Sequence, residues 1–227
     1  MFKFEALCLL EKTNDIFMGV ILKETINDDC ILGMWEIEED FDTLFSRLKL
    51  DDDELQRLEG FKSHSRKLEW LSVRTLIKDM LGKKSRIIYN AEKKPFLKGN
   101  SWNISISHSY NLTSIFISKK KRVGIDLELM SHKISSISHK FINAQEEVTD
   151  DPEQKRYHLY IHWCAKEAMY KICDKQDINF KENLTVYPFV PSESGMIKGR
   201  VLNLRGVEDF WLRYRRYKDY SIVWTCK

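Results

Sequence analysis

Two segments of the chain carry acidic side chains at a spacing that suits metal chemistry. Residues 122–129 alternate polar and apolar side chains, which predicts a strand with Asp126 and Glu128 side by side on one face. A helix predicted farther along the chain places Glu167 and Lys171, four residues apart, on one face. If these two faces meet, three carboxylates converge beside one lysine. Such carboxylates repel one another unless a hard cation such as Mg²⁺ holds them, and magnesium beside a lysine suits a phosphate-bearing substrate.

The composition is that of a globular chain and indicates no nucleic-acid partner. The 227 residues fit one large domain or two small ones, and aromatic residues are well represented. A net charge of +3 is too small to indicate nucleic acid. The five cysteines are scattered without a Cys-x-x-Cys pair, so neither a zinc site nor a disulfide framework is predicted. A charged amino terminus and the lack of a long apolar run predict no signal peptide, no membrane contact and a cytoplasmic location.

Apolar periodicity predicts an α+β chain made of two comparable halves. The predicted strands are residues 4–10, 16–22, 31–37, 86–89, 102–109, 113–118, 122–129, 183–189, 199–204, 210–217 and 220–226. The predicted long helices are residues 65–81, ended by Gly82, and residues 154–173. The three strands between residues 102 and 129 are expected to follow one another as an antiparallel series joined by turns. Each half then runs strands, helix, strands, which hints at an internal duplication with a site between the halves.

Basic and hydroxyl side chains near these elements suit phosphate binding. Arg74 lies on the first long helix, Lys94 and Pro95 lie in the following loop, and Ser107 and His108 lie where a strand ends. Taken singly, each of these residues is more often solvated or structural than functional. Taken together, they can supply donors to phosphate oxygens. Residues 140–147 are predicted to begin a short helix, in which Glu146 would complete a capping box.

Five motifs in this order resemble the Sfp-type 4′-phosphopantetheinyl transferases. They are Lys94-Pro95, Ile106-Ser107-His108-Ser109, Val123-Gly124-Ile125-Asp126-Leu127-Glu128, Phe141 with Glu146, and Trp163-x-x-Lys166-Glu167-Ala168-x-x-Lys171. The ordered motifs cover residues 93–171, and weaker similarity at Glu69-Trp70-Leu71-x-x-Arg74 extends into the first half. The chain departs from the family at Lys93 and Tyr110, which stand where glycine is usual. Neither change removes a group that the chemistry needs.

The resemblance implies an enzyme of the holo-[acyl-carrier-protein] synthase type. Such an enzyme moves 4′-phosphopantetheine from coenzyme A to a serine of an apo acyl or peptidyl carrier protein and releases 3′,5′-ADP. It also implies the pseudo-duplicated transferase fold, in which each half is a small, mainly antiparallel sheet packed on a long helix. Residues 1–100 would contact the nucleotide end and the carrier, and residues 101–227 would hold the magnesium site and the catalytic motifs. A monomer is expected, since one chain can complete the site.

The resemblance also assigns roles residue by residue. Asp126, Glu128 and Glu167 would carry Mg²⁺. The coenzyme A ligands would be Arg74, Lys94, Pro95, Ser107, His108 and Lys171. The catalytic set would be Glu146 as general base, Lys171 on the pyrophosphate and Lys166 in support, with a metal-bound water as the alternative base. Two other interpretations stay open: a non-catalytic coenzyme A or nucleotide-binding module, and an α+β interaction domain whose acidic residues are solvated surface. The sequence leaves the carrier, its pathway and the tolerance for acylated coenzyme A undetermined.

Overall fold

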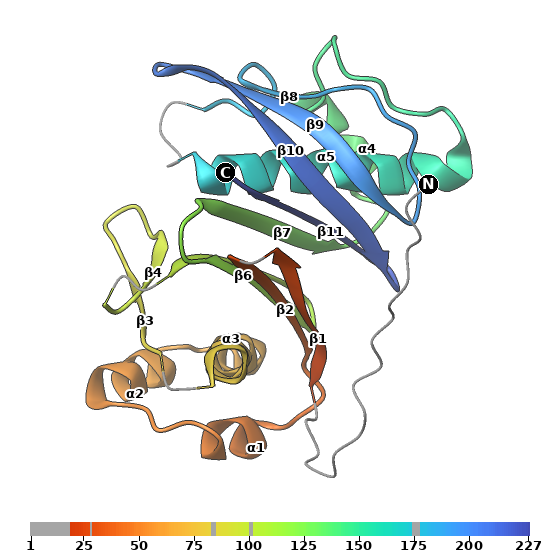
Figure 1. Cartoon of the computed structure of the whole chain (residues 1–227). Helices are drawn as coiled ribbons and strands as arrows, with labels where there is room; N and C mark the ends of the chain where they lie inside the picture. Colours follow the sequence, from red (N-terminus) through yellow and green to blue (C-terminus); the bar gives the residue numbers. More distant parts are fainter. Residues whose placement is uncertain (1–18, 28, 83–84, 100–101, 174–177) are drawn as a thin grey trace.

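A computed structural model of the chain describes residues 19–27, 29–82, 85–99, 102–173 and 178–227 (Figure 1). The helices are α1 (Phe41–Ser46), α2 (Asp52–Glu59), α3 (His64–Leu81), α4 (Ile134–Ile137) and α5 (Pro152–Ile172), with a 3₁₀ turn η1 at Ser138–Lys140. The strands of the first part are β1 (Val20–Asn27), β2 (Cys30–Glu36), β3 (Ile87–Tyr89), β4 (Pro95–Leu97), β5 (Asn103–Ser109) and β6 (Leu112–Ser118). The later strands are β7 (Val123–Leu129), β8 (Leu184–Val186), β9 (Ser194–Asn203), β10 (Gly206–Tyr217) and β11 (Tyr220–Cys226).

The fold is α+β, as the sequence predicts, and its described strand pairings are all antiparallel. One sheet has the order β1-β2-β6-β5 and the other the order β7-β11-β10-β9-β8, with β3 and β4 as a separate ribbon. The strand predicted at residues 4–10 and the start of the one at 16–22 lie outside the described residues. The two long helices are confirmed within two residues at each end.

The two sheets and the two long helices form four layers. Side chains alternate between the two faces of each strand, so successive residues belong to different layers. On β2, Leu32 and Met34 join the cluster that packs the two sheets together, whereas Trp35 joins the cluster under α3. On β7, Ile125 lies in the cluster between the sheets, so the next residue, Asp126, lies on the opposite face. The order is therefore α3, first sheet, second sheet, α5 (Figure 1). Each long helix covers the outer face of one sheet.

Local signals fix where the two long helices begin and end. The Ser63 hydroxyl accepts from the backbone N–H of Arg66 at the start of α3, and Gly82 ends this helix with a φ of 66°. At the start of α5, the Asp151 carboxylate accepts from the Glu153 N–H, and Pro152 occupies the first turn. These caps set the residue faces that α3 and α5 present to the sheets.

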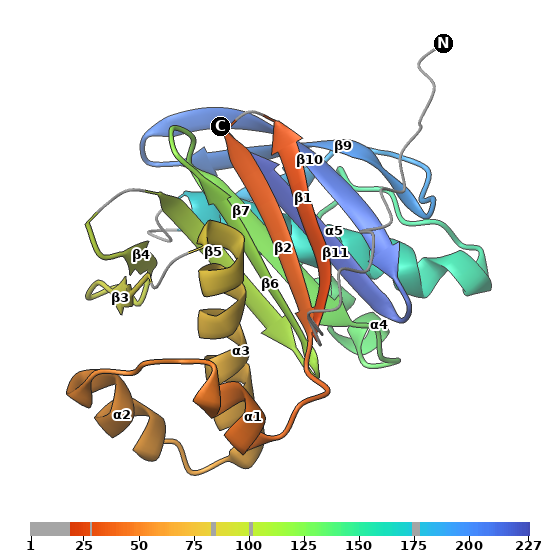
Figure 2. The same cartoon turned by 60° about the horizontal axis from the view of Figure 1, so that its bottom comes forward.

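The predicted three-stranded series is wrong at its third strand. β5 and β6 pair as expected, but β7 pairs with β11 in the other sheet. The link at residues 119–122 thus passes between sheets, because the side chains at 123, 125 and 127 are buried between the layers. The hydrogen bonds of the first sheet extend to Ser118 (Figure 2), and the domain boundary at residue 100 stays a prediction.

A second correction concerns the chain before α5. The helix predicted at residues 140–147 is absent there, and α4 and η1 come earlier, at Ile134–Lys140. The Asn143 side chain instead accepts from the Gln145 N–H in a tight turn, which competes with a helical start. Within the described ranges, none of the helices has the length and apolar character that crossing a bilayer requires.

Candidate active site

Gly124 lets α5 approach β7 closely enough to cover its acidic face. A Cβ at this position would stand 2.1 Å from the Ala168 carbonyl oxygen, so the backbone of α5 leaves no room for a side chain. Asp126 and Glu128 follow on the same face of β7. The close contact at Gly124 therefore directs both carboxylates toward α5, as the alternation in the sequence predicts.

Asp126 is buried, and its two carboxylate oxygens are bonded very differently. Its exposed fraction is 4%. Oδ1 accepts from the Ser107 hydroxyl at 2.8 Å and from Lys171 Nζ at 2.7 Å. Oδ2 is buried without a hydrogen-bond partner. An ionised carboxylate oxygen left this way is costly, and a divalent cation is a ligand that would satisfy it.

Lys171 stands beside Asp126 and ties α5 to both sheets. Its Nζ donates to the Ile125 carbonyl oxygen on β7 at 2.9 Å and lies 3.1 Å from the Ser107 hydroxyl on β5. The side chain is 20% exposed. The ammonium group is thus held rigidly by oxygen acceptors beside the acidic face, where the sequence predicted a lysine.

Glu128 lies next to Asp126 and is held from both sides. Ser109 donates to its Oε2 at 2.9 Å, and the Trp163 side chain on α5 donates a further hydrogen bond. Burial first, and then the charge of Asp126, raise the pKa of Glu128. Part of this shift is repulsion between the two carboxylates, which a shared cation would offset.

Glu167 is placed between these contacts by helical spacing. Trp163 and Lys171, one turn before and one turn after it on α5, touch Glu128 and Asp126 respectively. Among the described residues, however, no three acidic, histidine or cysteine side chains stand as an assembled metal cluster. The convergence of the three carboxylates on one ion therefore stays a prediction, and Lys171 and the serine hydroxyls engage the strand carboxylates. The oxygen-only donor set and the unpaired Asp126 Oδ2 nevertheless fit a magnesium ion.

Cys164 lies close to these acids but is not a nucleophile. It is fully buried, and its thiol donates to the Ser221 carbonyl oxygen at 3.6 Å. Burial, followed by the charges of Asp126 and Glu128, raises the pKa of the Cys164 thiol far above its ordinary value. Cys164 is therefore a small core residue.

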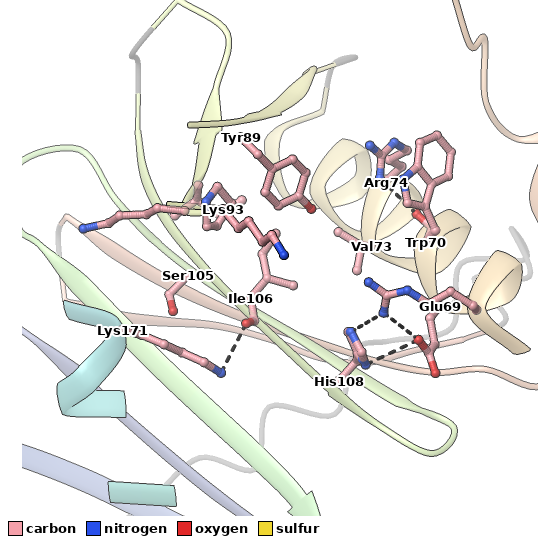
Figure 3. A pocket seen from close by; sticks show the side chains of 14 residues that line it. Glu69, Trp70, Val73, Arg74, Tyr89, Lys93, Ser105, Ile106, His108 and Lys171 are labelled. Carbon is pink, nitrogen blue, oxygen red and sulfur yellow. Dashed lines mark hydrogen bonds and ion pairs between the residues drawn. The ribbon is translucent and has the colours of Figure 1, made fainter. Parts of the chain in front are cut away.

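A cleft of about 180 Å³ opens beside the acidic face (Figure 3). Its charged and aromatic lining comes from α3, the β3–β4 ribbon, β5 and α5. The lining residues are Arg66, Glu69, Trp70, Val73, Arg74, Tyr89, Lys93, Lys94, Pro95, Ile104, Ser105, Ile106, His108 and Lys171. Five of them are lysine or arginine and only one is a carboxylate. This excess of positive charge suits a ligand with several phosphates.

His108 and Arg66 contact one another in the lining of the cleft. Arg66 Nη1 lies 2.6 Å from His108 Nε2, and Glu69 Oε2 lies 2.8 Å from the same Nη1. Figure 3 shows Glu69 and His108 pointing toward one another, with Lys171 entering from another side. Burial lowers the pKa of His108, and Glu69 opposes this effect. His108 is therefore favoured as a neutral hydrogen-bonding group.

Arg74 lines the cleft from a buried position. Only 4% of it is exposed, its Nε lies 3.4 Å from Glu54 Oε1, and its guanidinium stacks on the Trp70 ring at 3.1 Å. Burial lowers its pKa to about 10. These contacts make Arg74 a support of the cleft wall, and its predicted contact with the nucleotide stays a prediction.

Lys94 and Pro95 line the cleft from the β3–β4 ribbon, together with two residues that the sequence reasoning left out of the site. Lys93, at a φ of 61°, and Tyr89 belong to the same ribbon. Arg66 also lines the cleft, although a basic residue on a helix face is usually solvated. The signal that points to it is its spacing from Glu69 and Arg74 on one helix.

The acidic face of β7 and helix α5 both lie in a segment that matches a known protein family. Residues 122–221 match the family model of the 4′-phosphopantetheinyl transferase superfamily. These residues form a domain of that superfamily. The domain holds Asp126, Glu128, Glu167 and Lys171, whereas the cleft residues from α3, β3–β4 and β5 precede it. The chain matches no curated protein. The family-level resemblance is confirmed, and the Sfp-type subfamily stays a prediction.

Glu146 and Lys166 form a buried pair outside the cleft lining. Both lie within the matched residues 122–221, called the transferase domain below. Their side chains are 0% exposed, and Lys166 Nζ lies 2.7 Å from Glu146 Oε2. Oε2 also accepts from the Asn143 N–H, and Oε1 accepts from the Val186 N–H, both at 2.8 Å. Burial raises the pKa of Glu146, but His162 and Lys166 outweigh it and leave the pKa lowered.

This network ties three segments of the transferase domain together. Lys166 donates to the carbonyl oxygens of Phe141 and Phe180, so α5 is joined to the chain before it and after it. Glu146 makes the return half of the predicted capping box, to Asn143, although no helix follows. The contacts support a structural role for both residues. The roles of Glu146 as base and of Lys166 in catalysis stay predictions.

The buried His158 should make the stability of the transferase domain depend on pH. Burial, and then His162, lower the pKa of His158 to about 4 from an ordinary 6.5. Its Nδ1 accepts from the Thr149 N–H at 3.1 Å, a bond that protonation would break. The contribution of neutral His158 is complete above pH 6.5 and is lost as the pH falls toward 4, by up to about 3 kcal/mol.

Urea unfolding measured at pH 7.5 and pH 5 checks this expectation. The free energy of unfolding should fall less between these two pH values in His158→Gln than in the unchanged protein. The same substitution at the exposed His132 is the control and should leave the pH dependence as it was. Equal pH dependence in all three proteins would contradict the assignment.

Proposed function

We propose that the protein transfers the 4′-phosphopantetheine group of coenzyme A to a serine of an apo acyl or peptidyl carrier protein. The other product is 3′,5′-ADP, and the reaction depends on Mg²⁺. The superfamily match of residues 122–221 supports phosphopantetheine transfer at the level of the family. The features of this chain support the finer assignment, as an Sfp-type enzyme acting on a carrier protein.

The observation that supports the proposal most directly is that Lys171 takes part in both the cleft and the acidic face. It lines the positively charged cleft and also bonds to Asp126 at 2.7 Å. A ligand that fills the cleft therefore brings its phosphates to the acidic face. A diphosphate that reaches from the cleft to these carboxylates needs cations on both sides, which is the arrangement that phosphoryl transfer requires.

The residues of the chain would divide the work along the ligand. Arg66, His108 and the lysines of the β3–β4 ribbon would bind phosphate oxygens and orient the nucleotide end. Lys171 would offset negative charge that builds up on the leaving 3′,5′-ADP. Asp126, Glu128 and Glu167 would hold Mg²⁺, which supplies charge neutralisation to the diphosphate when it is bound.

The carrier serine must lose a proton as it attacks the phosphorus. A general base has to come within hydrogen-bond distance of that hydroxyl. Glu146 has both oxygens engaged in a fully buried network, so it could serve only if the turn at residues 141–146 opened. The basic cleft rim would also speed the encounter with an acidic carrier.

Mass spectrometry of carrier proteins tests the proposal. Apo carriers from fatty acid, polyketide and peptide synthesis would be incubated with the full-length protein, coenzyme A and Mg²⁺. At least one carrier should gain the mass of one phosphopantetheine group, and 3′,5′-ADP should appear in equal amount. A carrier with its serine changed to alanine, and a reaction with chelator, should show neither.

The same experiment separates the two function classes. Coenzyme A that binds without magnesium and modifies no carrier would favour a non-catalytic binding module. Such a module needs the phosphate-binding cations but not the acids on β7. The presence of both in one chain favours the enzyme.

A further inference from the structure

Glu69 is the one carboxylate among the described residues that line the cleft. It lies on α3, one turn after Arg66, and its side chain is 17% exposed. A negative charge in a phosphate-binding cleft repels the ligand that the cleft is built to hold. A specific function is therefore needed to explain why an acid stands there.

Glu69 contacts Arg66 and His108, the two groups of the cleft that are best suited to bind phosphate. Its Oε2 accepts from Arg66 Nη1 at 2.8 Å and lies 3.5 Å from His108 Nδ1. An arginine only donates, so His108 Nε2 accepts from Arg66 and the ring proton is assigned to Nδ1, facing Glu69. Glu69 Oε2 thus receives donors from two sides, as a phosphate oxygen would.

The backbone at Glu69 is fixed, so only its side chain is able to move aside. The next residues of α3, Trp70 and Leu71, are buried in the core under the first sheet. One turn later, the Ser72 hydroxyl lies 2.8 Å from the Thr113 hydroxyl on β6 and donates to the Glu69 carbonyl oxygen. The helix therefore holds the backbone of Glu69 beside the donors of the cleft, and a ligand can displace only the side chain.

We propose that the Glu69 carboxylate competes with a substrate phosphate for Arg66 and His108, so that the phosphate binds by displacing it. This inference rests on the proposed function and adds a specificity-determining residue to it. A doubly charged phosphate attracts Arg66 more strongly than a carboxylate does, whereas a singly charged group does not. Glu69 then selects for dianionic phosphate and against other anionic ligands.

The test is the binding of coenzyme A to Glu69→Gln, measured by calorimetry. Glutamine keeps the shape and an acceptor oxygen but removes the charge, so coenzyme A should bind about fivefold more tightly. Glu69→Ala should change affinity in the same direction. The matched control is Asp79→Asn, since Asp79 also lies on α3, is 15% exposed and pairs with Arg47 at 3.1 Å outside the cleft. This control should bind coenzyme A as the unchanged protein does.

Two further measurements identify the competing groups. In an Arg66→Met background, Glu69→Gln should raise the affinity less than it does in the unchanged protein, because one of the two shared donors is gone. Dephospho-coenzyme A, which lacks the 3′-phosphate, distinguishes the phosphates. A gain that disappears with this ligand assigns the competing group to the doubly charged 3′-phosphate and supports the proposal. A gain that persists assigns it to the diphosphate, whose phosphates are singly charged, and contradicts selection for a dianion.

Equal or weaker binding of coenzyme A to both Glu69 variants, with circular dichroism unchanged, would overturn the inference. It would leave the proposed function standing, because the unchanged protein would still bind coenzyme A and modify a carrier. Failure of the unchanged protein to bind coenzyme A at all would instead overturn both.

Discussion

Asp126→Asn should lower magnesium-dependent phosphopantetheine transfer by about 10³-fold or more. The substitution removes the charge of a carboxylate whose Oδ2 is buried without a partner and is the best-placed ligand for a divalent ion. The measurement is the rate of carrier modification at saturating coenzyme A, over a range of Mg²⁺ concentrations. Activity near that of the unchanged protein would remove Asp126 from the metal site.

The variant also has a folding cost that the sequence did not predict. A carboxylate on a strand face is often solvated, but Asp126 is 4% exposed and pairs with Lys171. Losing the charge of Asp126 leaves the partly buried ammonium group without its counter-charge, which costs about 3 kcal/mol. The double variant Asp126→Asn/Lys171→Met removes both charges and should recover part of this stability without recovering transfer.

Lys171→Met should lower the turnover number by about 10²-fold or more while carrier affinity changes little. The ammonium group lies at the junction of the cleft and the acidic face, where charge on the leaving 3′,5′-ADP would develop. Steady-state kinetics with the carrier as varied substrate separates the two effects. A turnover number equal to that of the unchanged protein would show that Lys171 only holds α5 in place.

Lys155→Met is the matched control for this prediction. Lys155 lies on the same helix and pairs with Asp150 at 3.3 Å, but its side chain is 47% exposed and lies far along α5 from the cleft. It should keep the turnover number of the unchanged protein. A loss in both lysine variants would indicate a general effect of charge on α5.

The acidic face could be predicted from the sequence because strand and helix periodicity are local. Alternation along residues 122–129 placed Asp126 and Glu128 together, and the four-residue spacing placed Glu167 between Trp163 and Lys171. Each of these relations depends on neighbours in the chain. They hold in the structure, where Trp163 and Lys171 reach Glu128 and Asp126.

Other features depend on partners that are distant in the chain. The pairing of β7 with β11 joins segments about ninety residues apart, and no pattern within residues 102–129 distinguishes it from a hairpin with β6. The role of Glu69 depends on His108 across the cleft. The burial of Glu146 depends on Lys166 and Val186, whose positions are set by packing of the second sheet on α5.

Electron paramagnetic resonance with Mn²⁺ in place of Mg²⁺ tests the central claim most directly. The full-length protein with Mn²⁺ and coenzyme A should give a protein-bound manganese signal that is coupled to phosphorus of the diphosphate. Asp126→Asn should lose that signal at the same concentrations. A signal with the same affinity and the same phosphorus coupling in Asp126→Asn would contradict an ion held jointly by β7, α5 and the substrate.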